Sequence, residues 1–534
     1  MVLYLPINWW ITNVSVKPAV NQAVPISTNT NQNFNDGCYV PIFDLYDESE
    51  KLYMVPDDHN KNCDRNLKPL TELSNGSWRI IQEKKGRTCK ARCYELPELT
   101  GPLKISDWFP PGPTECEFLE TACWENGLFG EKEVYGYIHT QILPKPLSKP
   151  SKTNKNLPDV FVILVDSMSS RMMKRSLAKS VEFMTQQFQA VDFPFYSQVA
   201  LRSQENKWKR EVCKMEGRLK SIGVRKNIVI KKTDLKITKE HLKGWKSCRE
   251  VHSAVLEYFQ QFVEAYKDYP KFVWYWSVHL AHNFLMGADR FDKPLLEFLQ
   301  GNYEMFDDAF IVLMADHGFR AGSPEFYKTE IGDLERHNPA LMISVPKKYR
   351  DNGILHVLTK NSQRLQTHYD LRATLLDIAK YQPSSEFSNT ALLEIPGEKG
   401  HSLLREQPLT PRNCETLPII QDYCICRSKS IDMRHDTKLS NRLATELITY
   451  VHETLDSLNV SSLCHKYEFE EVTALNIISL NGARATYKIV VKTKQPAIFE
   501  TLVTDNEAGN LEFGEIERGD RYGTSTYCTK KTHY

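Results

Sequence analysis

Asp159-Val160-Phe161-Val162-Ile163-Leu164-Val165-Asp166-Ser167 is the stretch of this sequence that decides the fold. The run from Val160 to Val165 is apolar and rich in β-branched residues, which favours a strand buried on both faces. Asp166 follows this strand directly. Because open α/β sheets bind their ligands beyond the carboxyl ends of the strands, Asp166 is a candidate ligand-binding residue. The alternative is a carboxylate that caps the next helix.

Two further apolar runs repeat this design. Lys271 to Val278 predicts a second strand, which ends at His279-Leu280-Ala281-His282. Ala309 to Ala315 predicts a third strand, which ends at Asp316-His317-Gly318. Segments with the apolar periodicity of a helix precede both strands. Strands that alternate with helices in this way predict an α/β fold.

The 534 residues are too many for one ordinary core, so we expect more than one domain. Residues 1–155 combine cysteines, turn-forming residues and short alternating runs, which indicates a mostly β or irregular domain that ends in a proline-rich linker. Residues 156–410 contain the strands described above and form the predicted α/β domain. Residues 411–534 are typical of a small α+β region.

The overall charge gives no reason to expect a polyanionic partner. The 68 basic and 67 acidic residues leave a net charge of +1, so we expect neither nucleic acid nor an anionic membrane surface to be bound. The apolar residues 1–14 make a poor signal peptide and are too short to span a bilayer. No other stretch is long and apolar enough, so we expect no membrane span in this chain.

The thirteen cysteines are unevenly distributed, and six of them precede residue 124. This pattern is typical of a disulfide-bonded module in a secreted or luminal protein. The alternative is zinc binding in a cytosolic protein, because Cys89-x3-Cys93 and Cys424-x-Cys426 have tolerable ligand spacings. Sequons that permit glycosylation occur at Asn13, Asn75 and Asn459.

The residues at the strand ends have the chemistry of a metal site. Asp166, Asp316 and His317 are ligand types that hold zinc or another divalent ion, provided that the two strand ends lie together. Gly318 favours this interpretation, since glycine lets the backbone turn sharply away from the site.

Several motifs make the sequence resemble a known group of proteins. They are Asp159 to Ser170, Asp192-Phe193-Pro194-Phe195-Tyr196 and Leu313 to Gly322, with further matches at residues 338–342, 367–375, 412–418 and 423–426. Together they resemble an animal family of uncharacterised extracellular proteins in the alkaline phosphatase and sulfatase superfamily. The resemblance covers most of residues 35–500 and implies a mixed, mostly parallel α/β sheet flanked by helices, with a metal site at one edge.

The resemblance also implies a reaction. In that superfamily a serine, threonine or modified cysteine attacks phosphorus or sulfur beside one or two divalent ions. The family pattern Val-Gly-Leu-Asn-Ser-x-Pro-Asn matches Val199 to Asn206 at Ser203 and Asn206. This chain departs from the pattern at Ala200, Arg202 and Glu205. Ser203 is therefore the candidate nucleophile, although the missing glycine and proline leave the shape of its turn open. The alternative is an ordinary surface serine.

The remaining candidates complete the expected site. His282 matches the family's histidine after the second strand and is expected to bind metal, whereas the acid that follows in the pattern is Asn283 here. Arg320 is a candidate for binding a substrate oxyanion, the alternative being a solvated arginine. Weaker metal candidates are His279, His337 and His401.

These features predict a metal-dependent hydrolase of phosphate or sulfate esters, secreted or luminal, that uses zinc, or else calcium. The substrate class is a small anionic ester or a modified glycan or lipid head group. The segment between Ser203 and the predicted helix that ends near Tyr266 is shorter than the resemblance implies. The alternative is therefore an inactive extracellular member of the same fold with a binding or structural role.

Overall fold

The computed structural model describes most of the chain from Cys38 to Arg518. The described residues are 38–54, 63, 68–95, 104–127, 130–144, 157–199, 233, 235–242, 250–278, 280–414, 416–417, 419, 423–426, 431–458, 460–481, 484–495, 497–505, 510–514 and 516–518.

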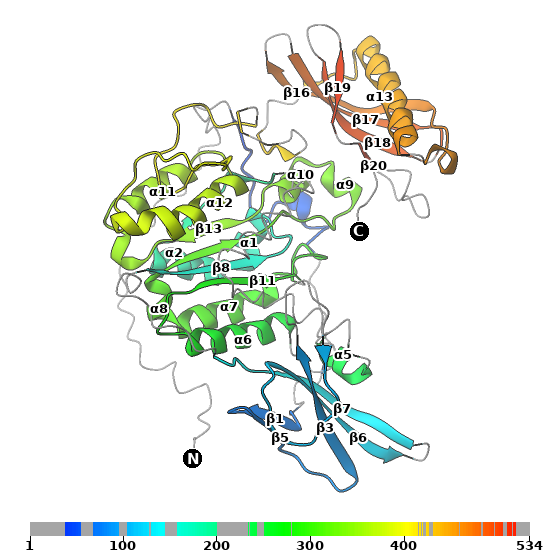
Figure 1. Ribbon diagram of the computed structural model, residues 1–534. Coiled ribbons are helices and arrows are strands. Elements are labelled where there is room, and N and C mark those ends of the chain that lie inside the picture. The colour runs from blue at the N-terminus through cyan, green and yellow to red at the C-terminus, as the bar shows by residue number, and fades with distance from the viewer. Residues whose placement is uncertain are drawn as a thin grey trace. The chain divides into compact units, whose positions relative to one another are not determined.

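A five-stranded sheet organises the α/β region, with the strand order β11-β8-β12-β13-β9 (Figure 1). β8 pairs in parallel with β11 on one side and with β12 on the other, whereas β13 runs antiparallel to both of its neighbours. Four of the five strands therefore point the same way, which confirms the mixed, mostly parallel sheet. The bounds are β8 Asp159–Val165, β9 Val191–Asp192, β11 Phe272–Ser277, β12 Ala309–Met314 and β13 Leu341–Ser344.

The alternating side chains of β8 explain why its sequence is apolar throughout. Phe161, Ile163 and Val165 belong to the core formed with the helices on one face of the sheet, including α6 and α7. The side chains between them, such as Val162, pack on the opposite face in a second core that includes residues of α11 and α12. Figure 1 shows these two helix pairs on opposite sides of the sheet. Burial on both faces removes the polar alternation of a half-exposed strand.

Helices flank the sheet and connect its strands. The segment after Ser167, which has the pattern of one helix, forms two, because the chain turns at Leu177 between α1 and α2. These helices are α1 Ser170–Ser176, α2 Ala178–Phe188, α6 Val251–Ala265, α7 Asp289–Gly301, α8 Tyr303–Asp307, α9 Pro324–Tyr327, α10 Glu330–His337, α11 Ile354–Ser362 and α12 His368–Leu376. The helix α5 Lys236–Leu242 lies instead against the N-terminal strand Gly130–Thr140, where the N–H of Ile237 donates to Glu133. A two-residue parallel pair, β10 Tyr196–Ser197 and β14 Gln366–Thr367, links two of the connections.

The N-terminal region is mostly β and disulfide-bonded, as its composition predicts. One sheet has the order β4-β3-β6-β7 and another the order β1-β2-β5. Cys89 and Cys123 lie opposite each other on β3 and β6 and form a disulfide, and Cys93 bonds to Cys116. The strands are β1 Thr71–Ser74, β2 Ser77–Ile80, β3 Arg87–Glu95, β4 Lys104–Ile105, β5 Gly112–Pro113, β6 Phe118–Gly127 and β7 Gly130–Thr140.

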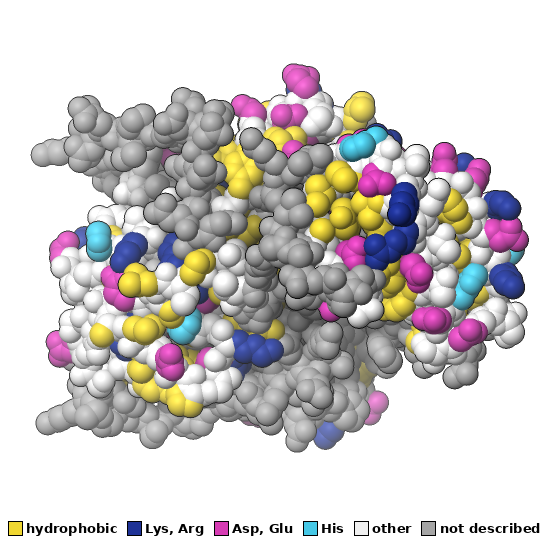
Figure 2. All heavy atoms as spheres, turned by 90° about the horizontal axis from the view of Figure 1, so that it is seen from above, with side chains coloured by type: hydrophobic (Ala, Val, Ile, Leu, Met, Phe, Trp, Pro, Cys, Tyr) yellow, Lys and Arg dark blue, Asp and Glu magenta, His cyan; other side chains and the backbone are white. Residues whose placement is uncertain are grey.

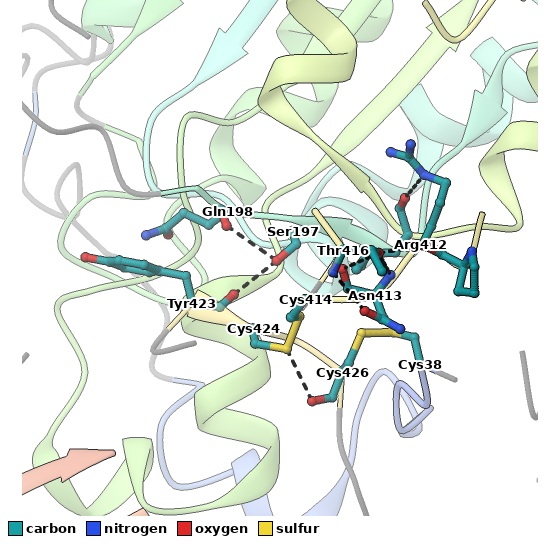
Figure 3. Close-up of a disulfide and its surroundings, with 12 residues drawn as sticks. Cys38, Ser197, Gln198, Arg412, Asn413, Cys414, Thr416, Tyr423, Cys424 and Cys426 are labelled. Carbon is teal, nitrogen blue, oxygen red and sulfur yellow. Dashed lines mark hydrogen bonds between the residues drawn. A yellow bond between two sulfur atoms is a disulfide. The ribbon is translucent and has the colours of Figure 1, made fainter. Parts of the chain in front are cut away.

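A segment that precedes these strands is bonded covalently to a segment that follows the α/β region in the sequence. Cys38 forms a disulfide with Cys426, across 388 residues of sequence. A second disulfide, between Cys414 and Cys424, lies beside it (Figure 3). The backbone carbonyl of Tyr423 accepts a hydrogen bond of 3.0 Å from the Ser197 hydroxyl, so this cysteine cluster is also attached to β10.

Buried ion pairs hold the same segment against two helices. Glu50 contacts Arg171 at 2.5 Å and Arg175 at 3.2 Å, and both arginines also contact Glu335 of α10. All four side chains are almost fully buried. Removing any one of the four would leave the buried cluster with an uncompensated net charge, so this cluster fixes α1 against α10.

The C-terminal region is α+β, as predicted. Its antiparallel sheet has the order β15-β16-β17-β18-β19, with β20 also paired to β18, and α13 contributes to the same core. The elements are β15 Ile431–Asp432, α13 Thr437–Ser457, β16 Phe469–Asn481, β17 Arg484–Thr493, β18 Ile498–Asp505, β19 Leu511–Phe513 and β20 Glu517–Arg518. The domain boundaries proposed at residues 155 and 410 stay predictions.

The surface is mixed in charge. On the face shown in Figure 2, basic and acidic side chains of the described residues are interspersed rather than gathered by sign. Among the helices that the structure describes, none combines the length and apolarity needed to cross a membrane.

Candidate metal centre

The parallel register of β8 and β12 brings two carboxylates to one edge of the sheet. Leu164 lies opposite Met314, and Asp166 and Asp316 each follow two residues later. Both side chains therefore leave the sheet at the same level. This is the edge beyond the carboxyl ends of the strands, where the sequence predicts the site.

Asp166, Asp316 and His317 converge. One potential ligand atom from each side chain lies within 4.8 Å of the other two. The Nε2 atom of His317 is 3.9 Å from Oδ1 of Asp166 and 3.8 Å from Oδ2 of Asp316. Its Nδ1 atom lies 2.8 Å from the carbonyl oxygen of Gly318. A carbonyl oxygen only accepts hydrogen bonds, so this contact requires the proton of the neutral ring on Nδ1.

This tautomer directs the lone pair of Nε2 toward two carboxylates. Two anionic groups and a lone pair repel one another unless a cation lies among them. The separations of 3.8 and 3.9 Å are wider than a hydrogen bond and leave room for a small ion. A histidine ligand whose other nitrogen donates to a backbone carbonyl is a common arrangement at metal sites. The three residues therefore fit a divalent cation.

Electrostatics within the cluster support the same interpretation. Burial raises the pKa of Asp166, the charge of Asp316 raises it further, and His317 and His282 oppose the shift. Burial also lowers the pKa of His317, which favours the neutral ring. A bound cation would reverse the penalty on Asp166, because an opposite charge nearby favours the ionised carboxylate.

The glycine after the histidine has a packing role. A Cβ atom at Gly318 would lie 2.2 Å from the carbonyl oxygen of Glu335, closer than any side chain tolerates. Glycine is therefore required because the backbones at Gly318 and Glu335 approach too closely for a side chain. Phe319 donates its N–H to that same carbonyl oxygen at 2.8 Å. The sharp turn expected from the sequence is not the reason, since no positive φ occurs at Gly318.

Two alternative readings of the sequence are wrong. The helix after β8 is capped by Ser169, whose hydroxyl accepts the N–H of Met172, so Asp166 is not a helix cap. The sulfurs of Cys414, Cys424 and Cys426 lie within 4.8 Å of one another. They belong to two disulfides, however, and a disulfide sulfur is not the thiolate that zinc requires.

The other site predictions have different outcomes. Ser203 and His279 lie outside the described residues, and Ser203 follows the last described residue of its segment, Val199, by four positions. His282 is exposed and its Nδ1 lies 2.8 Å from Oδ1 of Asn283. It is not part of the 4.8 Å group, although its charge acts on Asp166.

The structure describes His337 and His401, two of the weaker metal candidates, and Arg320, the candidate for binding an oxyanion. His337 is buried in α10, with Nδ1 3.2 Å from Asp333, and its ring packs edge-on against Tyr423. His401 is half-buried, and its backbone N–H donates to Asp370. Arg320 is exposed, and within the part of the chain that the structure describes no hydrogen bond or ion pair joins its guanidinium to another side chain. Its charge acts on His317, so it lies near the cluster.

His368, which the sequence does not single out, lies directly behind the site. It is the first residue of α12, is buried, and its Nε2 contacts the carbonyl oxygen of Ala315 at 3.3 Å. Burial lowers its pKa to about 4. The sequence offers two signals near it, the family match at residues 367–375 and the capping box of Thr367 and Asp370, which fixes where α12 begins.

Replacing His368 by glutamine is expected to remove part of the acid sensitivity of folding. The folded pKa of about 4 lies below the ordinary value of 6.5, so the unfolded chain binds more protons between these values. Stability is therefore present above pH 6.5 and is lost as the pH falls toward 4, by up to about 3 kcal/mol. Urea unfolding from pH 4 to 7 with a chelator present should show a flatter profile for His368→Gln.

The matched control for this prediction is His356→Gln, which changes an exposed histidine on α11. It should keep the wild-type profile. Equal pH profiles for wild type and His368→Gln would contradict the buried, neutral state of His368.

Comparisons with solved structures return sixteen matching chains. The lipoteichoic acid synthase LtaP from Listeria monocytogenes matches with 11% identity and a TM-score of 0.27, over 49% of this chain and 77% of the synthase. The protein Ps i-CgsB matches with 11% identity and a TM-score of 0.22, over 36% of this chain and 66% of its own. Similarities this weak say nothing about the activity of this chain.

The sequence comparisons give a clearer result. No curated protein matches this chain in sequence. The model of the family described as "Protein of unknown function (DUF229)" matches residues 32–207 and 225–473. The break between the two matched parts falls in the segment that follows Ser203. This is the segment that is shorter than the family resemblance implies. Because the match covers most of its length, the chain belongs to the family of proteins of unknown function DUF229.

Proposed function

We propose that this protein is a metal-dependent hydrolase of phosphate or sulfate esters that acts outside the cytosol. The observation that carries the proposal is the orientation of His317. Its Nδ1 contacts the carbonyl of Gly318, and its Nε2 faces the carboxylates of Asp166 and Asp316. Such a donor set has the composition of a zinc site, and the imidazole nitrogen makes calcium, which prefers oxygen ligands, the less suitable ion.

Each residue of the chain has a distinct role in the proposed reaction. Asp166, Asp316 and His317 hold the ion, which when bound polarises the ester and stabilises charge on its oxygens. The hydroxyl of Ser203 would attack phosphorus or sulfur as its proton is lost, and the bond to the ester oxygen would break so that the alcohol leaves. Water would then hydrolyse the covalent seryl ester, which releases phosphate or sulfate and restores the serine hydroxyl. Arg320, which lies near the cluster and whose charge acts on His317, binds free oxygens of the ester. His282, exposed beside Asp166, is the candidate ligand of a second ion.

The substrate and the compartment follow from the same features. A local cation site in a chain whose net charge is only +1 suits a small anionic ester, or a phosphorylated or sulfated glycan or lipid head group, rather than nucleic acid. The disulfides Cys89–Cys123, Cys93–Cys116, Cys38–Cys426 and Cys414–Cys424 support a protein of the extracellular space or the secretory lumen.

A second candidate is a member of the family that binds its ion without hydrolysing an ester. It is favoured by Asn283, which replaces the acid of the family pattern and contacts His282. Such a protein would keep the first ion and lack the second. Hydrolysis measurements separate the two candidates.

The test is hydrolysis of p-nitrophenyl phosphate, bis-p-nitrophenyl phosphate and p-nitrophenyl sulfate by the full chain, together with its zinc content. We expect zinc to be present and at least one ester to be hydrolysed. Ser203→Ala should lose about 10³-fold or more in kcat with zinc retained, as expected of a nucleophile.

Ser221→Ala is the control, since it changes another serine of the same segment. Wild-type activity in Ser203→Ala would remove the nucleophile from the proposal. Bound zinc without hydrolysis of any ester would favour the non-catalytic candidate, and a protein that binds no divalent ion would contradict both.

A further inference from the structure

Ser167 makes contacts with all three members of the metal centre. Its N–H donates to Oδ1 of Asp316 at 3.2 Å, and its hydroxyl donates to Oδ1 of Asp166 at 3.1 Å. The same hydroxyl oxygen lies 3.4 Å from Nδ1 of His317. The side chain is buried, with 1% of its surface exposed, so water does not compete for these contacts.

The backbone of Ser167 has an unusual conformation. Its φ of 62° lies in the left-handed region, which residues other than glycine rarely adopt. Glycine would reach this conformation without strain, so the strained serine indicates that its hydroxyl has a role. The conformation directs the N–H of Ser167 toward Asp316, while the side chain reaches back to the carboxylate of Asp166.

The directions of the hydrogen bonds agree with the tautomer of His317. Nδ1 carries the ring proton because it contacts the carbonyl of Gly318, so the oxygen of Ser167 can only accept from it. The hydroxyl proton is then free to be donated to Asp166. One hydroxyl thus fixes the ring of His317 and the carboxylate of Asp166 at the same time, and leaves Nε2 to face the carboxylates.

We infer that Ser167 is the positioning residue of this centre, which holds the three ligand side chains in the geometry that selects a divalent ion. The inference rests on the proposed function, since it assigns Ser167 a role toward the ion of that site. Outer hydrogen-bonding partners of metal ligands contribute about 10- to 100-fold to metal affinity.

Two substitutions in the full chain separate the hydroxyl from the backbone. Ser167→Gly removes the hydroxyl and relieves the left-handed strain, and Ser167→Ala removes the hydroxyl and keeps the strain. Ser170→Ala is the control, because Ser170 is equally buried and begins α1 just beyond the site. Zinc affinity is measured by competition with a chromophoric chelator, and the metal-free Ser167→Gly protein is examined by crystallography.

We expect both Ser167 variants to bind zinc about 10- to 100-fold more weakly, with wild-type affinity in Ser170→Ala. In metal-free Ser167→Gly the Asp166 carboxylate and the His317 ring should leave their wild-type positions. Wild-type zinc affinity in Ser167→Gly would overturn the inference. A wild-type protein that binds no zinc would contradict the proposed function. The crystal structure tests the inference independently of zinc, because unchanged positions of Asp166 and His317 in Ser167→Gly would overturn it.

Discussion

Asp316→Asn is expected to abolish tight zinc binding and, with it, ester hydrolysis. Oδ1 of Asp316 accepts the N–H groups of Ser167 and His317, and Oδ2 faces Nε2 of His317 at 3.8 Å. Asparagine has nearly the same shape but removes the negative charge and one of the two acceptor oxygens. Loss of a residue that only hydrogen-bonds to a metal ligand lowers metal affinity by up to about 100-fold. Because Asp316 is itself a proposed ligand, the zinc affinity should fall by more than this.

The measurement is zinc content after dialysis, together with kcat for the ester that the wild type hydrolyses best. Asp308→Asn is the matched control, since it changes an exposed carboxylate that immediately precedes the same strand, β12, and pairs with Lys348 at 3.5 Å. It should keep full zinc occupancy. An Asp316→Asn protein that retains stoichiometric zinc would refute the assignment of this site.

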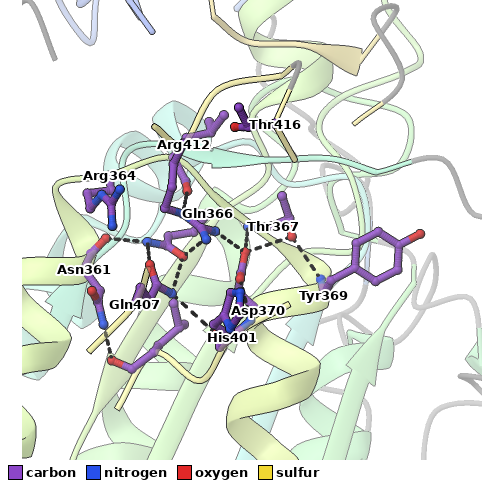
Figure 4. A network of polar contacts seen from close by, with 12 residues as sticks. Asn361, Arg364, Gln366, Thr367, Tyr369, Asp370, His401, Gln407, Arg412 and Thr416 are labelled. Carbon is purple, nitrogen blue, oxygen red and sulfur yellow. Dashed lines mark hydrogen bonds and ion pairs between the residues drawn. The ribbon is translucent and has the colours of Figure 1, made fainter. Parts of the chain in front are cut away.

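Asp370→Asn should produce the largest loss of stability of any conservative substitution considered for this chain. The buried carboxylate of Asp370 accepts the N–H and hydroxyl of Thr367, the N–H of His401 and the guanidinium of Arg412 at 2.7 Å (Figure 4). Three separate segments meet at this one side chain. Loss of its charge leaves Arg412 buried without its ionic partner, which costs about 3–5 kcal/mol.

Chemical denaturation of the full chain measures this effect. Glu72→Gln provides the comparison, because Glu72 pairs with Arg79 at a similar distance of 2.7 Å but both side chains are solvent-accessible. An exposed pair of this kind contributes about 1 kcal/mol or less. If the two substitutions had equal effects, burial would not be what makes the Asp370 network important.

The sequence predicts the sheet and the position of its acids because both depend on local patterns. The apolar run of β8 requires burial on both faces, and a parallel neighbour with the same pattern brings Asp316 to the level of Asp166. The convergence of Asp166, Asp316 and His317 can therefore be predicted without knowing how any other part of the chain folds.

Other features of the centre depend on contacts that no local pattern shows. The left-handed conformation of Ser167 is coupled to Asp316, 149 residues further along the chain. The low pKa of His368 results from burial behind β12, which its own helix does not reveal. A match to the family pattern can also mislead. His282 matches the family's histidine after the second strand, but its side chain is exposed and lies outside the group formed by Asp166, Asp316 and His317.

The disulfide between Cys38 and Cys426 has a consequence for biosynthesis. Its partners are 388 residues apart, so if the chain enters the secretory lumen as proposed, Cys38 would arrive there long before Cys426. At a synthesis rate of about 5–20 residues per second, the Cys38 thiol waits about 20–80 s for its partner. In that interval other cysteines, such as Cys89 and Cys93, enter the compartment first. The native cross-link would therefore form only if the Cys38 thiol stays reduced or if thiol–disulfide exchange releases it from an earlier partner.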